Sequence, residues 1–348
     1  MPLRRLAKIA AFSLSVALML VGCSGPALES GQTANVNFGA HVAGTIIINR
    51  NSSDSVKAAM MQFRDNVEKN TGGSVTLELV EATDSTDEFP TGGQFALVEQ
   101  RKAEHLGSST ACLNEPFLFR NYEHFTMAAN SSELLELLGE EMERQSGARP
   151  LAAFYTGSSH LVSSSPIGTI PDLEDLLEES GSVLALLDRD SFLSPYLEQL
   201  DIRTVEVALS NERKELLLGG EGDFAEFSTA GLQNNDWLES HLILTPSYHS
   251  ISFLWLVADS EFMNSLSLPQ RAAVLESVAS AFPAMEDEVL SREALLFSRL
   301  TDEGMVIDPT PTGLWQWVED GVQPDNSTER GSVERTVRQL IRGVYTRS

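Results

Sequence analysis

The chain has 348 residues and is strongly acidic, with 50 Asp and Glu residues against 24 Lys and Arg residues and a formal net charge of −26. This charge excludes nucleic acid as a partner, because the phosphate backbone is itself anionic. An acidic, solvated surface accounts for it. The length exceeds the roughly 250 to 300 residues at which a single hydrophobic core stops growing, so we expect two lobes.

The residue content gives little indication of a metal-binding or cofactor-binding site. Cys23 and Cys112 are the two cysteines, which are too few for a cysteine-based metal site. The six histidines show no i, i+4 pair and no HExxH spacing, so a zinc enzyme is unsupported. The glycine-rich and serine motifs of nucleotide binding and hydrolysis are also missing. We therefore expect no cofactor and no metal.

The N-terminus is typical of an exported protein. In residues 1–22, basic residues precede an uncharged apolar stretch that is shorter than the ~20 residues of a spanning helix, which is the pattern of a signal peptide. Small residues then lead to Cys23, as in a lipobox. We predict that Cys23 is lipidated and anchors the chain to a membrane in the periplasm or on the outer cell face, with residues 23–44 as a flexible tether. The alternative is an ordinary signal peptide beside an accidental cysteine.

After the tether, strand and helix patterns alternate. Residues 45–48 are β-branched and apolar, and a loop rich in helix-capping residues follows them, which predicts a strand leading into a helix over 55–70. This alternation indicates parallel sheets covered by helices on both faces. In chain order, further strands are predicted at 74–80, 148–156, 182–187, 204–209 and 250–259, a short apolar segment at 105–111, and further helices at 94–104, 131–145, 172–178, 269–304 and 332–345.

Six segments, in the same order, resemble the DctP-type solute-binding proteins of TRAP transporters. The resemblance runs from about Thr45 to the end of the chain. It implies an α/β, two-lobed fold of the type II periplasmic-binding-protein kind, with one long lobe-spanning helix. Lobe I would comprise 45–158 and 246–268, and lobe II would comprise 159–245 and 269–348. The segments are FRDNVEKNTGGSVTLEL, ALVEQRKAEHLGSS, PFLFRNYEHFTMA, SSSPIGTIPDLEDL, ERKELLLGGEGDFAE and LSLPQRAAVLESV.

The resemblance also implies a function. A small organic solute, carboxylates included, would be trapped between the lobes by closure and delivered to the permease subunits of a TRAP transporter in the membrane. The same fold in a ligand-sensing lipoprotein, or in one that has lost binding and keeps only interactions, is the alternative. An enzyme is not expected, because the adjacent Ser159 and His160 point to opposite faces of a strand and cannot form a dyad.

The arginines that hold the ligand carboxylate in the family are not at their places in this sequence. By local matching, those places fall on Ser159 and on Leu186 or Leu187. Arg50 or Arg189 could supply a cation from another direction, although a solvated surface arginine is the alternative for each.

A neutral or cationic ligand beside Glu226 is the other interpretation, since a carboxylate suits a donor or a positive charge. The remaining candidates are polar or aromatic residues at predicted strand ends and at the crossing between lobes, where crevices open in α/β sheets. Two of them, Phe227 and Trp255, could instead belong to the core. Besides Arg50, Arg189 and Glu226, the candidate ligand-binding residues are Ser109, Thr110, Asn114, Ser159, His160, Phe227, His249 and Trp255.

Overall fold

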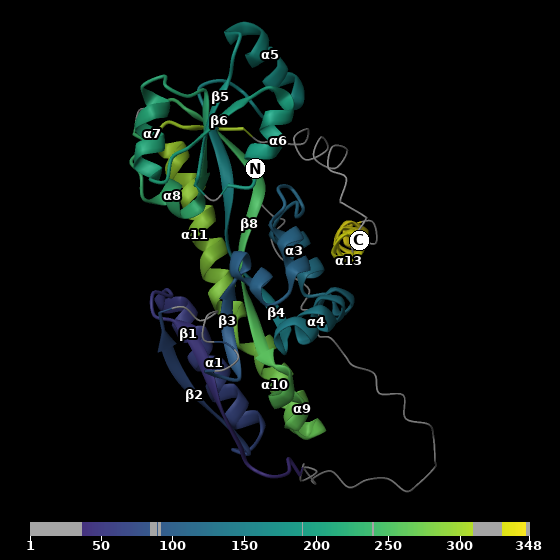
Figure 1. Ribbon diagram of the computed structural model, residues 1–348. Coiled ribbons are helices and arrows are strands. Elements are labelled where there is room, and N and C mark those ends of the chain that lie inside the picture. Colours follow the sequence, from purple (N-terminus) through teal and green to yellow (C-terminus); the bar gives the residue numbers. More distant parts are fainter. Residues whose placement is uncertain are drawn as a thin grey trace, which may run out of the picture. The chain divides into compact units, whose positions relative to one another are not determined.

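The computed structural model describes residues 37–83, 89, 92–189, 191–238, 240–308 and 329–345 (Figure 1). The chain divides into two compact units, and the second, Asn37–Ser348, contains all of these residues. The predicted signal peptide, Cys23 and most of the tether lie outside the described residues. Among the helices that are described, none has the length and apolar character needed to cross a membrane.

The described strands form one mixed sheet in the order β2-β1-β3-β8-β4-β7-β5-β6, with β9 paired to β8. β8 is antiparallel to β3 and β4, and β4 is antiparallel to β7. The expectation of parallel sheets is therefore wrong at the centre. The reason is that β4 and β8 carry the chain between the two halves of the sheet in opposite directions (Figure 1). The strands are β1 Val42–Asn49, β2 Val75–Ala82, β3 Phe95–Glu99, β4 Ala148–Ser163, β5 Leu184–Leu187, β6 Arg203–Glu206, β7 Phe224–Ser228, β8 Ile243–Asp259 and β9 Val306–Ile307.

Local sequence signals set most helix boundaries. The first helix, for example, begins at Asp54 because the Ser53 hydroxyl accepts a hydrogen bond from the Val56 amide. The α-helices are α1 Asp54–Asn70, α3 Tyr122–Ala129, α4 Ser132–Ser146, α5 Ile170–Ser180, α6 Ser194–Leu197, α7 Ser210–Leu218, α8 Thr229–Gln233, α9 Ser260–Ser265, α10 Leu268–Ala281, α11 Pro283–Asp302 and α13 Glu329–Tyr345. The 3₁₀ helices are η1 Gln100–His105, η2 Ser108–Asn114 and η3 Glu198–Leu200.

Two predicted helices are wrong. The helix expected over 94–104 is strand β3 followed by η1, because the segment is buried between β1 and β8. The single helix expected over 269–304 is divided into α10 and α11 at Pro283, which has no amide hydrogen to donate to the preceding turn. The lobe-spanning helix is therefore α11, with 20 residues.

Each half of the sheet has an apolar core on both faces. In the first half, Ile46 and Ile47 are fully buried in opposite cores, as the alternation of a strand requires. In the second half, Leu186 and Leu187 separate in the same way. A fold of two lobes, as inferred from the sequence, explains why each half of the sheet has apolar cores of its own.

Three C-terminal helices pack differently from one another. Val274 of α10 and Ile341 of α13 lie in cores of the first half, whereas Leu296 of α11 lies in a core of the second half. The predicted lobe boundaries, which assign 269–348 to lobe II, stay a prediction. The packing favours assigning α10 and α13 to lobe I.

Substituting Gly222 by Ala is expected to lower the free energy of unfolding by about 1 to 3 kcal/mol. A Cβ atom at Gly222 would lie 2.6 Å from Cγ of Leu186, a buried side chain that has little room to move. Urea unfolding would measure the loss. The control is Gly343→Ala in α13, where a Cβ atom meets nothing within 4 Å and should stabilise the helix slightly. Equal stability of the two variants would contradict the prediction.

Candidate functional site

The candidate site lies where the chain crosses between the two halves of the sheet, on the adjacent strands β7, β4 and β8. The pairing of β4 with β8 shifts register between Tyr155 and Gly157 and again between Ser159 and Leu161. Buried polar side chains gather here in two clusters. Burial of polar groups is costly unless they are hydrogen-bonded, so clusters of this kind indicate either precise packing or function.

The first, the Glu226 cluster, centres on a carboxylate that is 4% exposed. Oε1 of Glu226 lies 3.0 Å from Nε2 of His249, and Nδ1 of that ring lies 2.7 Å from the Ser247 hydroxyl. The Asp188 amide donates to Oε2 of Glu226 at 3.1 Å. Burial alone raises the pKa of Glu226, but the bonds and charge of His249, together with bonds from Ser191 and the Asp188 amide, lower it below its usual value.

The backbone beside His249 is strained. Tyr248 (φ 47°) and Phe117 (φ 60°) are bulky residues in the left-handed region, which costs about 1 to 3 kcal/mol each. The Phe117 amide donates to the His249 carbonyl at 2.8 Å, and the two rings lie 5.9 Å apart. Backbone strain held in place by its surroundings is concentrated at functional sites, which supports placing a site here.

An apolar cavity adjoins the Glu226 cluster. It has room for little more than one water molecule, at about 10 Å³. Phe117 lines it, and so does Leu161, which pairs with Glu226 across β4 and β7. Because residues paired across antiparallel strands share a face, the cavity lies on the same side of the sheet as Glu226.

The second, the Glu293 cluster, joins α11 to β4 and α8. The Glu293 carboxyl is 7% exposed and accepts hydrogen bonds from three hydroxyls, those of Tyr155 at 2.7 Å, Ser158 at 2.9 Å and Thr229 at 2.7 Å. Two of these residues flank Gly157, where β4 changes register. The cluster thus fastens the bent part of β4 to the helix that spans both halves.

His160 extends the Glu293 cluster. Its Nε2 lies 3.0 Å from the Ser158 hydroxyl, and its ring packs edge-on against Tyr248 and Phe297. Burial, with a smaller contribution from His249, lowers the pKa of His160 to about 3, so the ring is neutral at neutral pH. The sequence analysis excluded a contact of His160 with the adjacent Ser159; the contact is made by Ser158 instead, because side chains two apart on a strand share a face.

Two predicted aromatic candidates lie in the core. Phe227 is fully buried and packs edge-on against Trp237 with ring centroids 5.1 Å apart. Trp255 is 1% exposed and packs against Phe253. Their surroundings are those of core residues, the alternative considered for both.

The other polar candidates are spread over the fold. In η2, the Ser109 amide donates to the Glu141 carboxylate, and the Thr110 hydroxyl donates to a backbone carbonyl. The Oδ1 atom of Asn114 is buried without a partner among the described residues. Ser159 is 9% exposed on β4, opposite Ser228.

Arg50 and Arg189 are both exposed, at the ends of β1 and β5. Of all the predicted site residues, the structure joins one pair by a side-chain hydrogen bond within the described part of the chain, namely Glu226 and His249.

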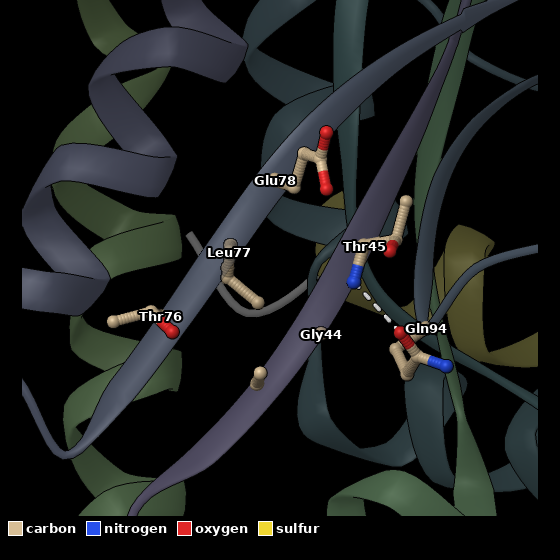
Figure 2. A pocket seen from close by; sticks show the side chains of 7 residues that line it. Gly44, Thr45, Thr76, Leu77, Glu78 and Gln94 are labelled. Atoms are coloured by element: carbon tan, nitrogen blue, oxygen red, sulfur yellow. Dashed lines mark hydrogen bonds between the residues drawn. The ribbon is translucent and has the colours of Figure 1, made fainter.

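A separate hollow lies over β1 and β2, away from the crossing. It has a volume of about 340 Å³, and Figure 2 shows the Gln94 side chain, whose Oε1 accepts a hydrogen bond from the Thr45 amide at 2.7 Å. None of the predicted site residues lines it. Its lining is Ala43, Gly44, Thr45, Thr76, Leu77, Glu78 and Gln94.

Part of the chain is similar to a known protein family. Residues 48–177 match the family model described as bacterial extracellular solute-binding protein, family 7, known as DctP. The predicted resemblance to DctP-type proteins is confirmed. No curated protein matches the chain.

Solved structures of TRAP periplasmic solute-binding proteins share the fold. One from Escherichia fergusonii is 15% identical, with a TM-score of 0.64 over 86% of this chain and 99% of that one. One from Rhodobacter sphaeroides is 14% identical, with a TM-score of 0.69 over 86% and 99%. One from Roseobacter denitrificans, solved with bound β-D-glucuronate, is 18% identical, with a TM-score of 0.58 over 86% and 98%. The predicted two-lobed fold is confirmed.

Proposed function

We propose that this protein is the extracytoplasmic solute-binding receptor of a TRAP-type transporter. It captures a small organic solute between the two halves and delivers it to the permease subunits in the membrane. The observation that carries the proposal is the buried Glu226 and His249 pair at the crossing, beside strained backbone and near a small apolar cavity. Anchorage through lipidated Cys23 belongs to the proposal and rests on the sequence.

The ligands of structural relatives support a solute of this size. The relative from Roseobacter denitrificans holds β-D-glucuronate, and one from Desulfovibrio desulfuricans holds sn-glycerol-3-phosphate. Both are small, polar and hydroxylated. A carboxylate with hydrogen-bond capacity left over, such as that of Glu226, is a suitable acceptor for hydroxyl groups of this kind.

The serine and histidine contacts are poorly suited to hydrolysis. The Ser158 hydroxyl meets Nε2 of His160, but a ring with a pKa of about 3 is a weak general base near neutral pH. Nδ1 of His160 also has no partner among the described residues, so no carboxylate orients the ring. The geometry therefore favours binding over nucleophilic catalysis.

Thermal unfolding of the chain from Ser24 onward, with a panel of organic acids, sugars, amino acids, polyols and quaternary amines, tests the proposal. A true ligand at a hundredfold its Kd should stabilise the protein by about 2.7 kcal/mol. Glu226→Gln should weaken its binding at least about tenfold, equivalent to 1.4 kcal/mol, because the variant lacks the anionic acceptor. The matched control is Glu288→Gln, an exposed residue of α11 that pairs with Arg292. If no compound raises the midpoint, the receptor proposal fails, and a lipoprotein with interactions alone becomes the better interpretation.

A further inference from the structure

Glu293 lies where helix α11 passes from the first half of the protein to the second. Four residues before it, Val289 packs in a core of the first half, and three residues after it, Leu296 packs in a core of the second half. The Glu293 carboxyl is 7% exposed and lies between these two anchoring residues. Its hydrogen bonds are therefore made at the place about which the two halves would move.

Strand β4 is bent beside Glu293, at Gly157. The φ angle of Gly157 is 146°, a conformation that residues with a side chain rarely adopt, and the pairing of β4 with β8 shifts register here. A shift of register bends a strand locally. Two residues before the bend, the Tyr155 amide donates to the Glu286 carboxyl of α11 at 2.9 Å. The bend thus lies in a strand that crosses between the halves and is bound to α11.

The three hydroxyls that donate to Glu293 lie on both sides of this bend. Tyr155 precedes Gly157 and Ser158 follows it. The third donor, Thr229, begins α8 in the second half. A rotation at Gly157 would therefore change the three distances to Glu293 by different amounts. Because hydrogen bonds weaken steeply with poor geometry, all three bonds can be satisfied together only over a narrow range of hinge angles.

The donors around Glu293 form a directed network. The Ser158 hydroxyl donates its one proton to Glu293 at 2.9 Å, so it accepts from Nε2 of His160 at 3.0 Å. The other ring nitrogen, Nδ1 of His160, has no partner among the described residues. The Tyr155 hydroxyl lies 2.7 Å from each carboxyl oxygen of Glu293. An amide at position 293 would place a donor where one of these acceptor oxygens lies, so it would hold the hydroxyls less well.

We propose that Glu293 is a positioning residue that locks the hinge of the receptor. Its three bonds stabilise the relative orientation of the halves seen in the structure, and the equilibrium between this orientation and other hinge angles contributes to the affinity for the solute. A solute that requires another hinge angle binds only after these bonds change, which lowers its apparent affinity. This inference rests on the proposed receptor function, in which the solute lies between the halves.

Distances between spin labels on the two halves test the proposal without any solute. The labels are attached through Glu68→Cys in α1 and Glu179→Cys in α5, at exposed positions, whereas Cys112 is buried. Pulsed electron paramagnetic resonance on the chain from Ser24 onward should give one narrow distance distribution for the wild type. Glu293→Gln should raise the ratio of other distances to this one at least about fivefold.

Two further sets of variants make the result specific. Tyr155→Phe with Thr229→Val removes two of the donors and keeps the side-chain shapes, so it should shift the distance distribution in the same direction as Glu293→Gln. The matched control is Glu288→Gln, an exposed acid of the same helix, which should leave the distribution unchanged. A cooperative melting transition for each variant shows that it is folded when the distances are measured.

Binding provides a second measurement. Because the hinge equilibrium contributes the same factor to every solute that requires the same closure, Glu293→Gln should change the Kd of all solutes that bind by one common factor. A residue that touched the solute would discriminate among them. Factors that differ by more than about threefold between solutes would contradict an action through the hinge.

The outcomes separate the two proposals. Distance distributions of Glu293→Gln and of Tyr155→Phe with Thr229→Val that match the wild type overturn the assignment of Glu293, whichever solute binds. A shifted distribution together with a common change in Kd supports it. A shifted distribution with no compound of the panel bound supports the hinge role and overturns the receptor function alone.

Discussion

Lowering the pH from 6.5 to 4.5 is expected to reduce the free energy of unfolding by about 2 kcal/mol through His160 alone. Burial, helped by the nearby His249, lowers the pKa of His160 from 6.5 to about 3 in the folded protein. Within this range the unfolded chain takes up a proton at His160 and the folded chain does not. The stability that depends on the neutral ring is therefore complete above pH 6.5 and is lost at about 1.4 kcal/mol per pH unit below it.

Urea unfolding of the wild type and of His160→Gln at pH 7, 5.5 and 4.5 measures this dependence. The variant should lose stability less steeply, by about 1.4 kcal/mol per pH unit. Glu226 has little effect on this comparison. Its pKa is lowered in the folded protein, so its contribution to stability is lost only as the pH falls below the pKa of 4.5 in the unfolded chain. His105→Gln, at an exposed position of η1, should behave as the wild type does. Parallel curves for the wild type and His160→Gln would refute the prediction.

Much of the fold could be predicted from the sequence because the signals are local. The helix expected over 55–70, after a loop rich in capping residues, is α1, whose N-terminus is capped by the Ser53 hydroxyl three residues before Val56. β3 was misread because its pattern is ambiguous and its identity depends on burial between β1 and β8, which are distant in the chain. The break at Pro283 was readable in principle, since proline removes a helical hydrogen bond, but the apolar periodicity on either side concealed it.

The candidate site was less predictable, because its contacts depend on tertiary register. Glu226 and His249 were each recognised, but they lie on β7 and β8, which are separated by β4 in the sheet, so no sequence spacing reveals their hydrogen bond. Glu293 resembles any other acid of an amphipathic helix until its three hydroxyl partners are seen.

Replacing His249 by Ala is expected to lower the free energy of unfolding by about 3 kcal/mol at pH 7. The substitution removes the side-chain partner of Oε1 of Glu226, a carboxylate that is 4% exposed in the wild type, and with it the bond and the charge that offset the effect of burial on the pKa of Glu226. It also leaves the Ser247 hydroxyl without its 2.7 Å contact to the ring. A buried charge that loses its partner costs more than the net energy of the bond itself, because its desolvation is no longer compensated.

A double-mutant cycle separates this charge effect from simple loss of packing. In a His249→Ala background, Glu226→Gln replaces the unpaired carboxylate by a neutral amide of the same shape. The double variant should therefore be more stable than the sum of the single effects predicts, by at least about 1 kcal/mol in urea unfolding at pH 7. Strict additivity would mean that the 3.0 Å contact contributes nothing to stability. In that case the pair would be held in place by the surrounding strands, and its contribution would have to be sought in solute binding.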